Sequence, residues 1–188
     1  ISATLQPGES PDLLNVESNL NGTAIIKRGG YTQAAALTVS TAGVVGAHYF
    51  IDPNGNSVTL ACHSNLCSKA TNGGAFTIFL TTSVFPTYWQ FVDINGISYG
   101  VNSSRDPTIS YNGTTLSNIA APQGNVIELT KDRMVISGTS ANPNRVHYSA
   151  SGGYTNFTTG PQSSDPYFDD FGTTGDSVFG LKYANGKL

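Results

Sequence analysis

The segment Tyr-Trp-Gln-Phe-Val-Asp-Ile-Asn-Gly-Ile-Ser-Tyr-Gly-Val, residues 88–101, decides the fold of this chain. Asn95-Gly96 stands near its centre, between the apolar runs 88–94 and 97–101. Asn-Gly is the dipeptide best suited to a two-residue type I′ turn, because both central residues need φ > 0. The segment therefore predicts an antiparallel β-hairpin.

The same signal recurs along the whole chain of 188 residues. Five further Asn-Gly dipeptides begin at residues 21, 54, 72, 112 and 185. Short apolar runs separate these turns at a spacing of about 8–12 residues, which is typical of a β-sandwich or a β-barrel. We predict an all-β, antiparallel fold: a two-sheet β-sandwich of jelly-roll type, with a closed β-barrel as the alternative.

The C-terminal part of the chain predicts two more hairpins, a loop and a last strand. Residues 126–130 are expected to pair with 133–137, and residues 145–150 with 154–158 across Ser151-Gly-Gly153. Residues 160–176 are expected to form a loop, and residues 177–183 the final strand. At the other end, Pro7 and Pro11 disfavour regular structure, so residues 1–12 are predicted to be an extended arm or linker and residues 13–188 a single domain.

Composition excludes several functional classes. Only 11% of residues are charged, the net charge is −3, and the nine Lys and Arg are scattered, so the chain has no basic surface for nucleic acid. No apolar run approaches the roughly 20 residues that span a bilayer, so membrane insertion is not expected. With 38% hydrophobic residues, the chain is expected to fold.

Cys62 and Cys67 are the only cysteines, in Ala-Cys-His-Ser-Asn-Leu-Cys. Zinc needs about four ligands, and His63 is the only other candidate nearby, so a local disulfide is the preferred interpretation over two free thiols. A disulfide indicates an oxidising compartment, and we expect an extracellular, secreted or surface-displayed protein.

Four sequons could make the chain a glycoprotein. Their asparagines are Asn21, Asn102, Asn112 and Asn156. Chance alone predicts about as many in a sequence of this composition, and two of them coincide with Asn-Gly turns.

An acidic segment near the C-terminus is a candidate calcium site. Its carboxylates are Asp165, Asp169, Asp170 and Asp176. Hard oxygen ligands on a Gly-containing loop suit Ca²⁺, although the spacing does not match an EF-hand. The alternative is a solvated acidic loop without a metal.

Aromatic and polar residues around the only Trp form a candidate ligand site. Sugar rings present C–H faces that stack on exposed aromatic rings, while carboxylate and amide groups bind hydroxyls. The candidate ligand-binding residues are Tyr88, Trp89, Asp93, Asn95 and, in the acidic segment, Tyr167. The alternative is that Trp89 and Phe91 lie on a core-facing side of a strand.

Catalysis has weaker support than binding. Glycosidases generally need two carboxylates roughly 5–10 Å apart, and Glu128 with Asp169 is the best available pair. We therefore expect a carbohydrate-binding module of lectin or adhesin type that binds a glycan or cell-surface glycoconjugate, with Ca²⁺ as its only candidate cofactor. A carbohydrate-active enzyme, either hydrolase or lyase, is one alternative. Another is a structural or receptor-binding domain of a viral or cell-surface assembly. A second copy of the chain is a further partner that the sequence leaves open.

Overall fold

The structure is a computed structural model that describes residues 16–18, 25–27, 43–103, 105–158, 164–173 and 175–183. Contacts divide the chain into two compact units, residues 1–34 and 35–188. The first unit contains the antiparallel strands β1 (Val16–Ser18) and β2 (Ile25–Lys27). The predicted arm, residues 1–12, lies outside the described residues, so the predicted domain boundary stays a prediction.

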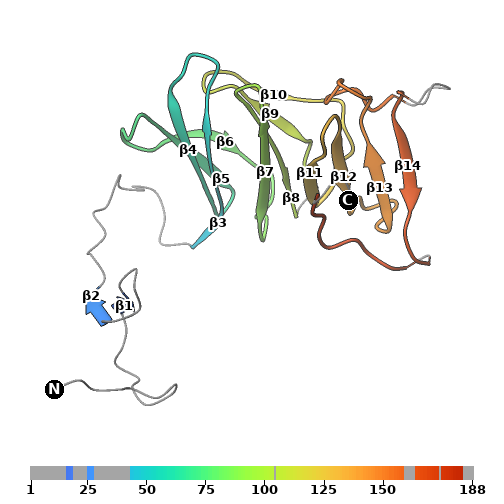
Figure 1. Cartoon of the computed structure of the whole chain (residues 1–188), viewed down its shortest axis with the longest axis horizontal. Coiled ribbons are helices and arrows are strands. Elements are labelled where there is room, and N and C mark those ends of the chain that lie inside the picture. The colour runs from blue at the N-terminus through green and yellow to red at the C-terminus, as the bar shows by residue number, and fades with distance from the viewer. Residues whose placement is uncertain are drawn as a thin grey trace. The chain divides into compact units, whose positions relative to one another are not determined.

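The second unit contains three antiparallel sheets, each a meander of four strands in chain order (Figure 1). The first sheet holds β3 (Val44–Ile51), β4 (Ser57–His63), β5 (Leu66–Thr71) and β6 (Thr77–Thr81). The second holds β7 (Trp89–Ile94), β8 (Ile97–Asn102), β9 (Ile109–Tyr111) and β10 (Leu116–Asn118). The third holds β11 (Val126–Leu129), β12 (Met134–Ser137), β13 (Arg145–Tyr148) and β14 (Tyr167–Asp170).

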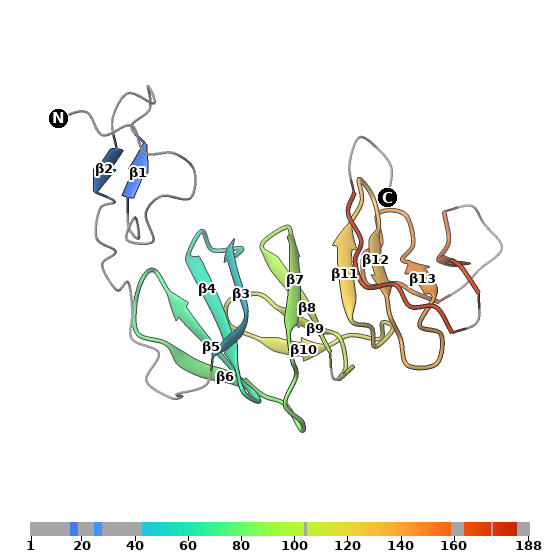
Figure 2. The same ribbon diagram turned by 90° about the horizontal axis from the view of Figure 1, so that it is seen from below.

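The predicted all-β, antiparallel fold is confirmed, and the described residues contain no helix. The alternative of a closed barrel is wrong for the described strands, because each of the three sheets ends in two separate edge strands. The chain instead stacks sheets: Figures 1 and 2 show the β7–β10 sheet between the other two.

Both faces of the β7–β10 sheet are packed, because its strands carry apolar side chains in both directions. Trp89, Phe91 and Tyr111 share the face that packs on the β3–β6 sheet. Tyr99 and Val101 point the other way, toward the β11–β14 sheet. The residues that they meet there are Ile127, Met134 and Ile136. Strands that are apolar on both faces are what a central layer requires.

The Asn-Gly turns are formed as predicted at two of the four described positions. Asn95 and Gly96 have φ values of 53° and 76°, and Asn72 and Gly73 have values of 50° and 71°, so both residues of each turn are left-handed. At 54–55 and 112–113 only the glycine has positive φ. The β7–β8 hairpin that the opening segment predicts is confirmed.

The predicted disulfide is also confirmed. Cys62 and Cys67 are bonded and face each other in the register of β4 and β5. Both are fully buried and pack with Trp89 and Ile109 in the layer between the first two sheets. The disulfide therefore joins β4 and β5 inside the core and does not close a surface loop.

The last hairpin and the last strand were predicted wrongly. Residues 154–158 form no strand, and β13 pairs instead with β14, inside the segment expected to be a loop. The Ser151-Gly-Gly153 turn ends in a single bridge between Ala150 and Gly153. Residues 177–183 are not a strand, and Val178 and Leu181 pack on Val135, Val146 and Tyr148 of the third sheet.

Candidate functional site

Trp89 belongs to the core rather than to an open surface. Only 6% of its surface is exposed, and its ring stacks on Phe91 with 5.4 Å between ring centroids. Strand β3 approaches so closely that a Cβ added to Gly46 would lie 2.5 Å from the Cβ of Trp89. The core alternative therefore describes Trp89, because its indole is buried and stacked on Phe91.

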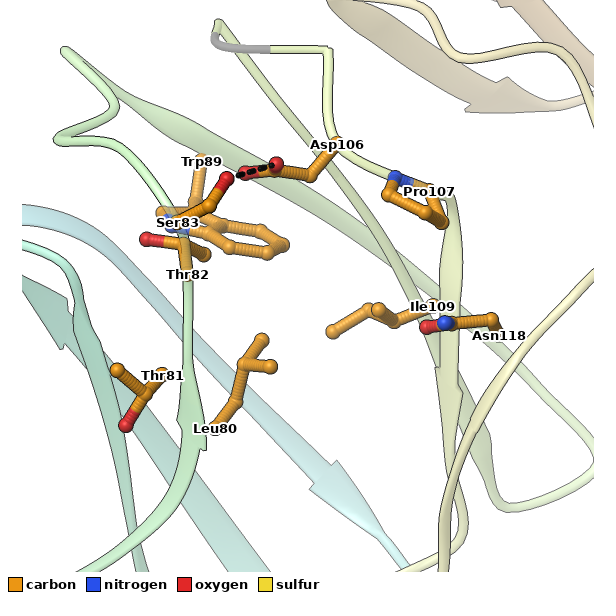
Figure 3. Close-up of a pocket in the computed structure, with 9 residues that line it drawn as sticks. All are labelled: Leu80, Thr81, Thr82, Ser83, Trp89, Asp106, Pro107, Ile109 and Asn118. Atoms are coloured by element: carbon orange, nitrogen blue, oxygen red, sulfur yellow. Dashed lines mark hydrogen bonds between the residues drawn. The ribbon is translucent and has the colours of Figure 1, made fainter.

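A small cavity of about 150 Å³ lies beside Trp89 where the first two sheets separate (Figure 3). Its apolar wall is formed by Leu80, Trp89 and Ile109. Across it, the Ser83 Oγ donates a hydrogen bond of 3.3 Å to Asp106 Oδ1, and the Asn102 Nδ2 donates one of 3.0 Å to Asp106 Oδ2. The volume is below the roughly 300 Å³ at which ligand pockets begin, so this cavity suits a few waters better than a sugar ring.

The other residues of the predicted Trp89 site do not gather around one surface. Asp93 lies on the same face as Trp89 but four residues along β7, which is about 13 Å. Its carboxylate lies 3.1 Å from the Nε2 of His48. Asn95 is at the hairpin tip, and Tyr88 precedes the strand and is half-buried.

A second concave surface lies on the far face of the β11–β14 sheet. It is a cavity of about 330 Å³ lined by Tyr148, Tyr167, Tyr183 and the turn residues 130–133, and we call it the tyrosine cleft. Tyr148 and Tyr167 face each other in the register of β13 and β14, and their rings stack at 4.3 Å with an interplanar angle of 10°. Tyr167 remains 44% exposed because β14 is an edge strand.

Charged groups border the tyrosine cleft and are held in place. The guanidinium of Arg133 lies 5.1 Å from the Tyr167 ring centroid and donates hydrogen bonds to the carbonyls of Ser149 and Asp165, the latter at 3.0 Å. Asp132 accepts a hydrogen bond of 2.6 Å from the Ser151 Oγ. The cleft thus combines aromatic rings with a fixed cation and a fixed carboxylate.

Burial raises the pKa of Tyr148 to about 12, with further contributions from Tyr167 and Asp169. Burial also raises the pKa of Tyr167, against the opposing effect of Arg133. Both phenols are therefore protonated at neutral pH, and each can donate one hydrogen bond while its ring offers apolar surface.

Of the predicted ligand-binding residues, only Tyr167 lines the tyrosine cleft. Sequence reasoning missed Tyr148, Tyr183 and Arg133. Lys131-Asp132 was recognised only as a turn between two strands. The sequence signal for this site was the position of Tyr148 and Tyr167 at the ends of strands. It could be interpreted only with the pairing of β13 and β14, which brings the two tyrosines together.

The four predicted calcium ligands are dispersed. Asp169 and Asp170 are consecutive in β14 and point to opposite faces of the sheet. Asp170 forms an ion pair with Arg145 at 2.7 Å, and Asp176 accepts a hydrogen bond of 2.7 Å from the Thr173 N–H. Within the described ranges, no group of three metal-binding side chains forms, and the calcium site stays a prediction.

The register separates the predicted catalytic pair. Glu128 on β11 and Asp169 on β14 lie on the same face of the sheet, but on its two opposite edge strands. Three strand spacings and an offset of two residues along the strands place them about 16 Å apart, beyond the 5–10 Å that glycoside hydrolysis uses. This pair therefore gains no support as an active site.

Three of the four predicted glycosylation sites lie among the described residues, and Asn21 lies outside them. Asn102 is 1% exposed, and its Nδ2 donates to Asp106. Asn112 accepts hydrogen bonds from the N–H groups of Thr114 and Thr115. Asn156 is exposed, so it offers a glycan the best access of the three.

Comparison with known proteins finds no matching family model, no matching curated protein and no matching solved structure. Of the residues that the structure describes, none forms a helix long and apolar enough to cross a membrane.

Proposed function

We propose that this chain is an extracellular glycan-binding module whose ligand site is the tyrosine cleft. The observation that carries the proposal is the stacked pair Tyr148–Tyr167, of which Tyr167 is 44% exposed, in the lining of a cavity of about 330 Å³. A sugar ring is amphipathic, and it needs an apolar surface for its C–H face together with groups that hydrogen-bond its hydroxyls. The cleft supplies both at one place.

Three features favour this function over the alternatives. The site lies on an edge strand and a turn carried by a packed scaffold, where binding residues concentrate. The Cys62–Cys67 disulfide is compatible with an oxidising, extracellular compartment. The face-to-face packing of neighbouring sheets is also the packing mode of β-sandwiches, which leave such loops and edges accessible.

A glycan array probed with the full chain, with and without EDTA, tests the proposal. We expect binding without turnover, and loss of binding in EDTA would support the predicted role of Ca²⁺. Tyr167→Ala should weaken binding about tenfold, because one stacking ring is removed. Tyr49→Ala is the matched control, since Tyr49 is 57% exposed on β3, in another sheet.

Two results would overturn the proposal. One is equal binding by wild type and Tyr167→Ala, and the other is no binding to any glycan. The second result would favour the structural or receptor-binding role. Turnover abolished by Glu128→Gln would instead favour the enzyme.

A further inference from the structure

We infer that Asn95 is a modification site, at which this protein converts asparagine to aspartate and isoaspartate without an enzyme. The backbone nitrogen of Gly96 attacks Cγ of Asn95, a C–N bond forms, and the side-chain nitrogen leaves as ammonia. Water then opens the resulting succinimide at either carbonyl. The reaction consumes one water and releases one ammonia, and it needs no oxidant or reductant.

This reaction has two structural requirements besides a following glycine. The asparagine side chain must be free to rotate toward the next backbone nitrogen. That nitrogen must also be able to lose its proton, which a hydrogen bond to a carbonyl opposes. The four described Asn-Gly turns differ in both respects, although their sequences are the same.

Two of the four asparagine side chains are held. The Oδ1 of Asn72 accepts a hydrogen bond of 3.0 Å from the Ser57 N–H, and its Nδ2 donates one of 3.0 Å to Asn56. The Oδ1 of Asn112 accepts hydrogen bonds of 3.0 Å and 2.7 Å from the N–H groups of Thr114 and Thr115. At both positions these bonds must break before Cγ can reach the next nitrogen.

At Asn54-Gly55 a hydrogen bond restrains the attacking backbone nitrogen instead of the asparagine side chain. The Gly55 N–H donates a hydrogen bond of 3.0 Å to the carbonyl of Asp52. Asn54 is further fixed by its own N–H, which donates to Asp52 Oδ1 at 2.9 Å. Deprotonation of Gly55 therefore costs the turn one of its hydrogen bonds.

Asn95 meets both requirements. It is exposed at the tip of the β7–β8 hairpin, and no described residue forms a hydrogen bond with its side chain or with the Gly96 N–H. Of the four turns, this is the one in which neither reacting group is restrained.

The modification would alter a contact between two sheets. A Cβ added to Gly96 would lie 2.8 Å from the Pro53 nitrogen, so the hairpin tip packs closely on the β3–β4 turn. Isoaspartate lengthens the backbone of this two-residue turn by one carbon, and either product adds a negative charge two residues from Asp93. We expect the modified tip to separate from Pro53.

The test is ageing of the folded full chain at neutral pH, followed by peptide mass mapping and isoaspartate quantification at each Asn-Gly. We expect Asn95 to react roughly five- to tenfold faster than Asn54, Asn72 and Asn112, the factor that one hydrogen bond provides. In denaturant the four rates should converge. Asn56→Ala should accelerate Asn72 and leave Asn95 unchanged, because it removes the hydrogen bond to Asn72 Nδ2.

Asn95→Gly supplies the matched control, because glycine accepts the left-handed φ of this position. This variant should abolish the modification at this turn, the fastest of the four described ones, and keep the fold. A rate at Asn72 or Asn112 equal to that at Asn95 in the folded chain would overturn the inference. So would a rank order that persists unchanged in denaturant.

Discussion

The Trp89 region and the tyrosine cleft each contain a pair of stacked aromatic rings, but the two pairs differ in their exposure to solvent. The ring pair Trp89–Phe91 is nearly parallel, as is the pair Tyr148–Tyr167, with interplanar angles of 8° and 10°. The first pair is enclosed between two sheets, whereas β14, which carries Tyr167, is exposed at all four residues. The comparison indicates that the position of a strand in its sheet matters more than the type of side chain. This position decides whether an aromatic ring stabilises the core or is available to a ligand.

The strongest test of this comparison is to truncate one ring in each region. Trp89→Ala should lower the free energy of unfolding by about 3–5 kcal/mol, because it leaves a cavity in a packed layer. Tyr167→Ala should lower it by about 1 kcal/mol, since it removes one stacking contact from a half-exposed position. Chemical denaturation followed by circular dichroism measures both, and equal losses would contradict the division into core and site.

Reducing the disulfide should have the next largest effect, and it should affect only the Trp89 region. The double variant Cys62→Ala, Cys67→Ala should lose about 2 kcal/mol, the loop-entropy contribution of a short ring. Unfolding with and without reductant measures this loss, and the double variant should no longer respond to reductant. The glycan binding that we propose for the cleft should remain, and its loss would show that the two regions depend on each other.

Much of the fold could be predicted because its signals are local. The Asn95-Gly96 turn and the apolar runs beside it predicted β7 and β8. The number of sheets could not be predicted in the same way, since an alternating pattern gives the faces of a strand but not what covers each face. A signal did exist: with Trp89 and Phe91 on one side and Val92 and Ile94 on the other, β7 is apolar on both faces.

The site was harder to predict, because it depends on one non-local pairing. Tyr148 meets Tyr167 only through the register of β13 and β14, across an intervening segment that itself begins with a turn at Ser151-Gly-Gly153. Strand β14, Tyr-Phe-Asp-Asp, lacks the alternation of a half-buried strand, since it is exposed on both faces.

The dependence of stability on alkaline pH tests the burial of Tyr148 in the cleft, and it needs no ligand. The pKa of Tyr148 is about 12 in the folded chain, compared with about 10 when unfolded. The unfolded state therefore loses its proton first, so the contribution of Tyr148 to the free energy of unfolding should be constant below pH 10 and fall as the pH rises from 10 to 12. Unfolding at a series of pH values, compared with Tyr148→Phe, measures this fall. An identical fall in the variant would contradict the assignment.

Acid should lower the free energy of unfolding less than ring truncation, loss of the disulfide or alkaline pH. Its effect should arise in the Trp89 region, from the protonation of His48. This ring stacks on both Phe50 and Phe91, and burial lowers its pKa below 6.5, against the opposing effect of Asp93. The unfolded chain then binds a proton more readily than the folded one, so stability should fall as the pH drops below 6.5.

Unfolding between pH 7 and pH 5 measures the acid effect, and His48→Gln should reduce it. Burial also lowers the pKa of His147 on β13, in the third sheet. His147→Gln is therefore the matched variant, and it should remove a separate part of the loss of stability in acid. Asp93→Asn should enlarge the loss, because it removes the carboxylate that favours the charged form of His48 while leaving the burial unchanged. A gain of stability by the wild type as the pH drops from 7 to 5 would mean that the ion pair with Asp93, and not burial against the aromatic rings, controls the protonation of His48.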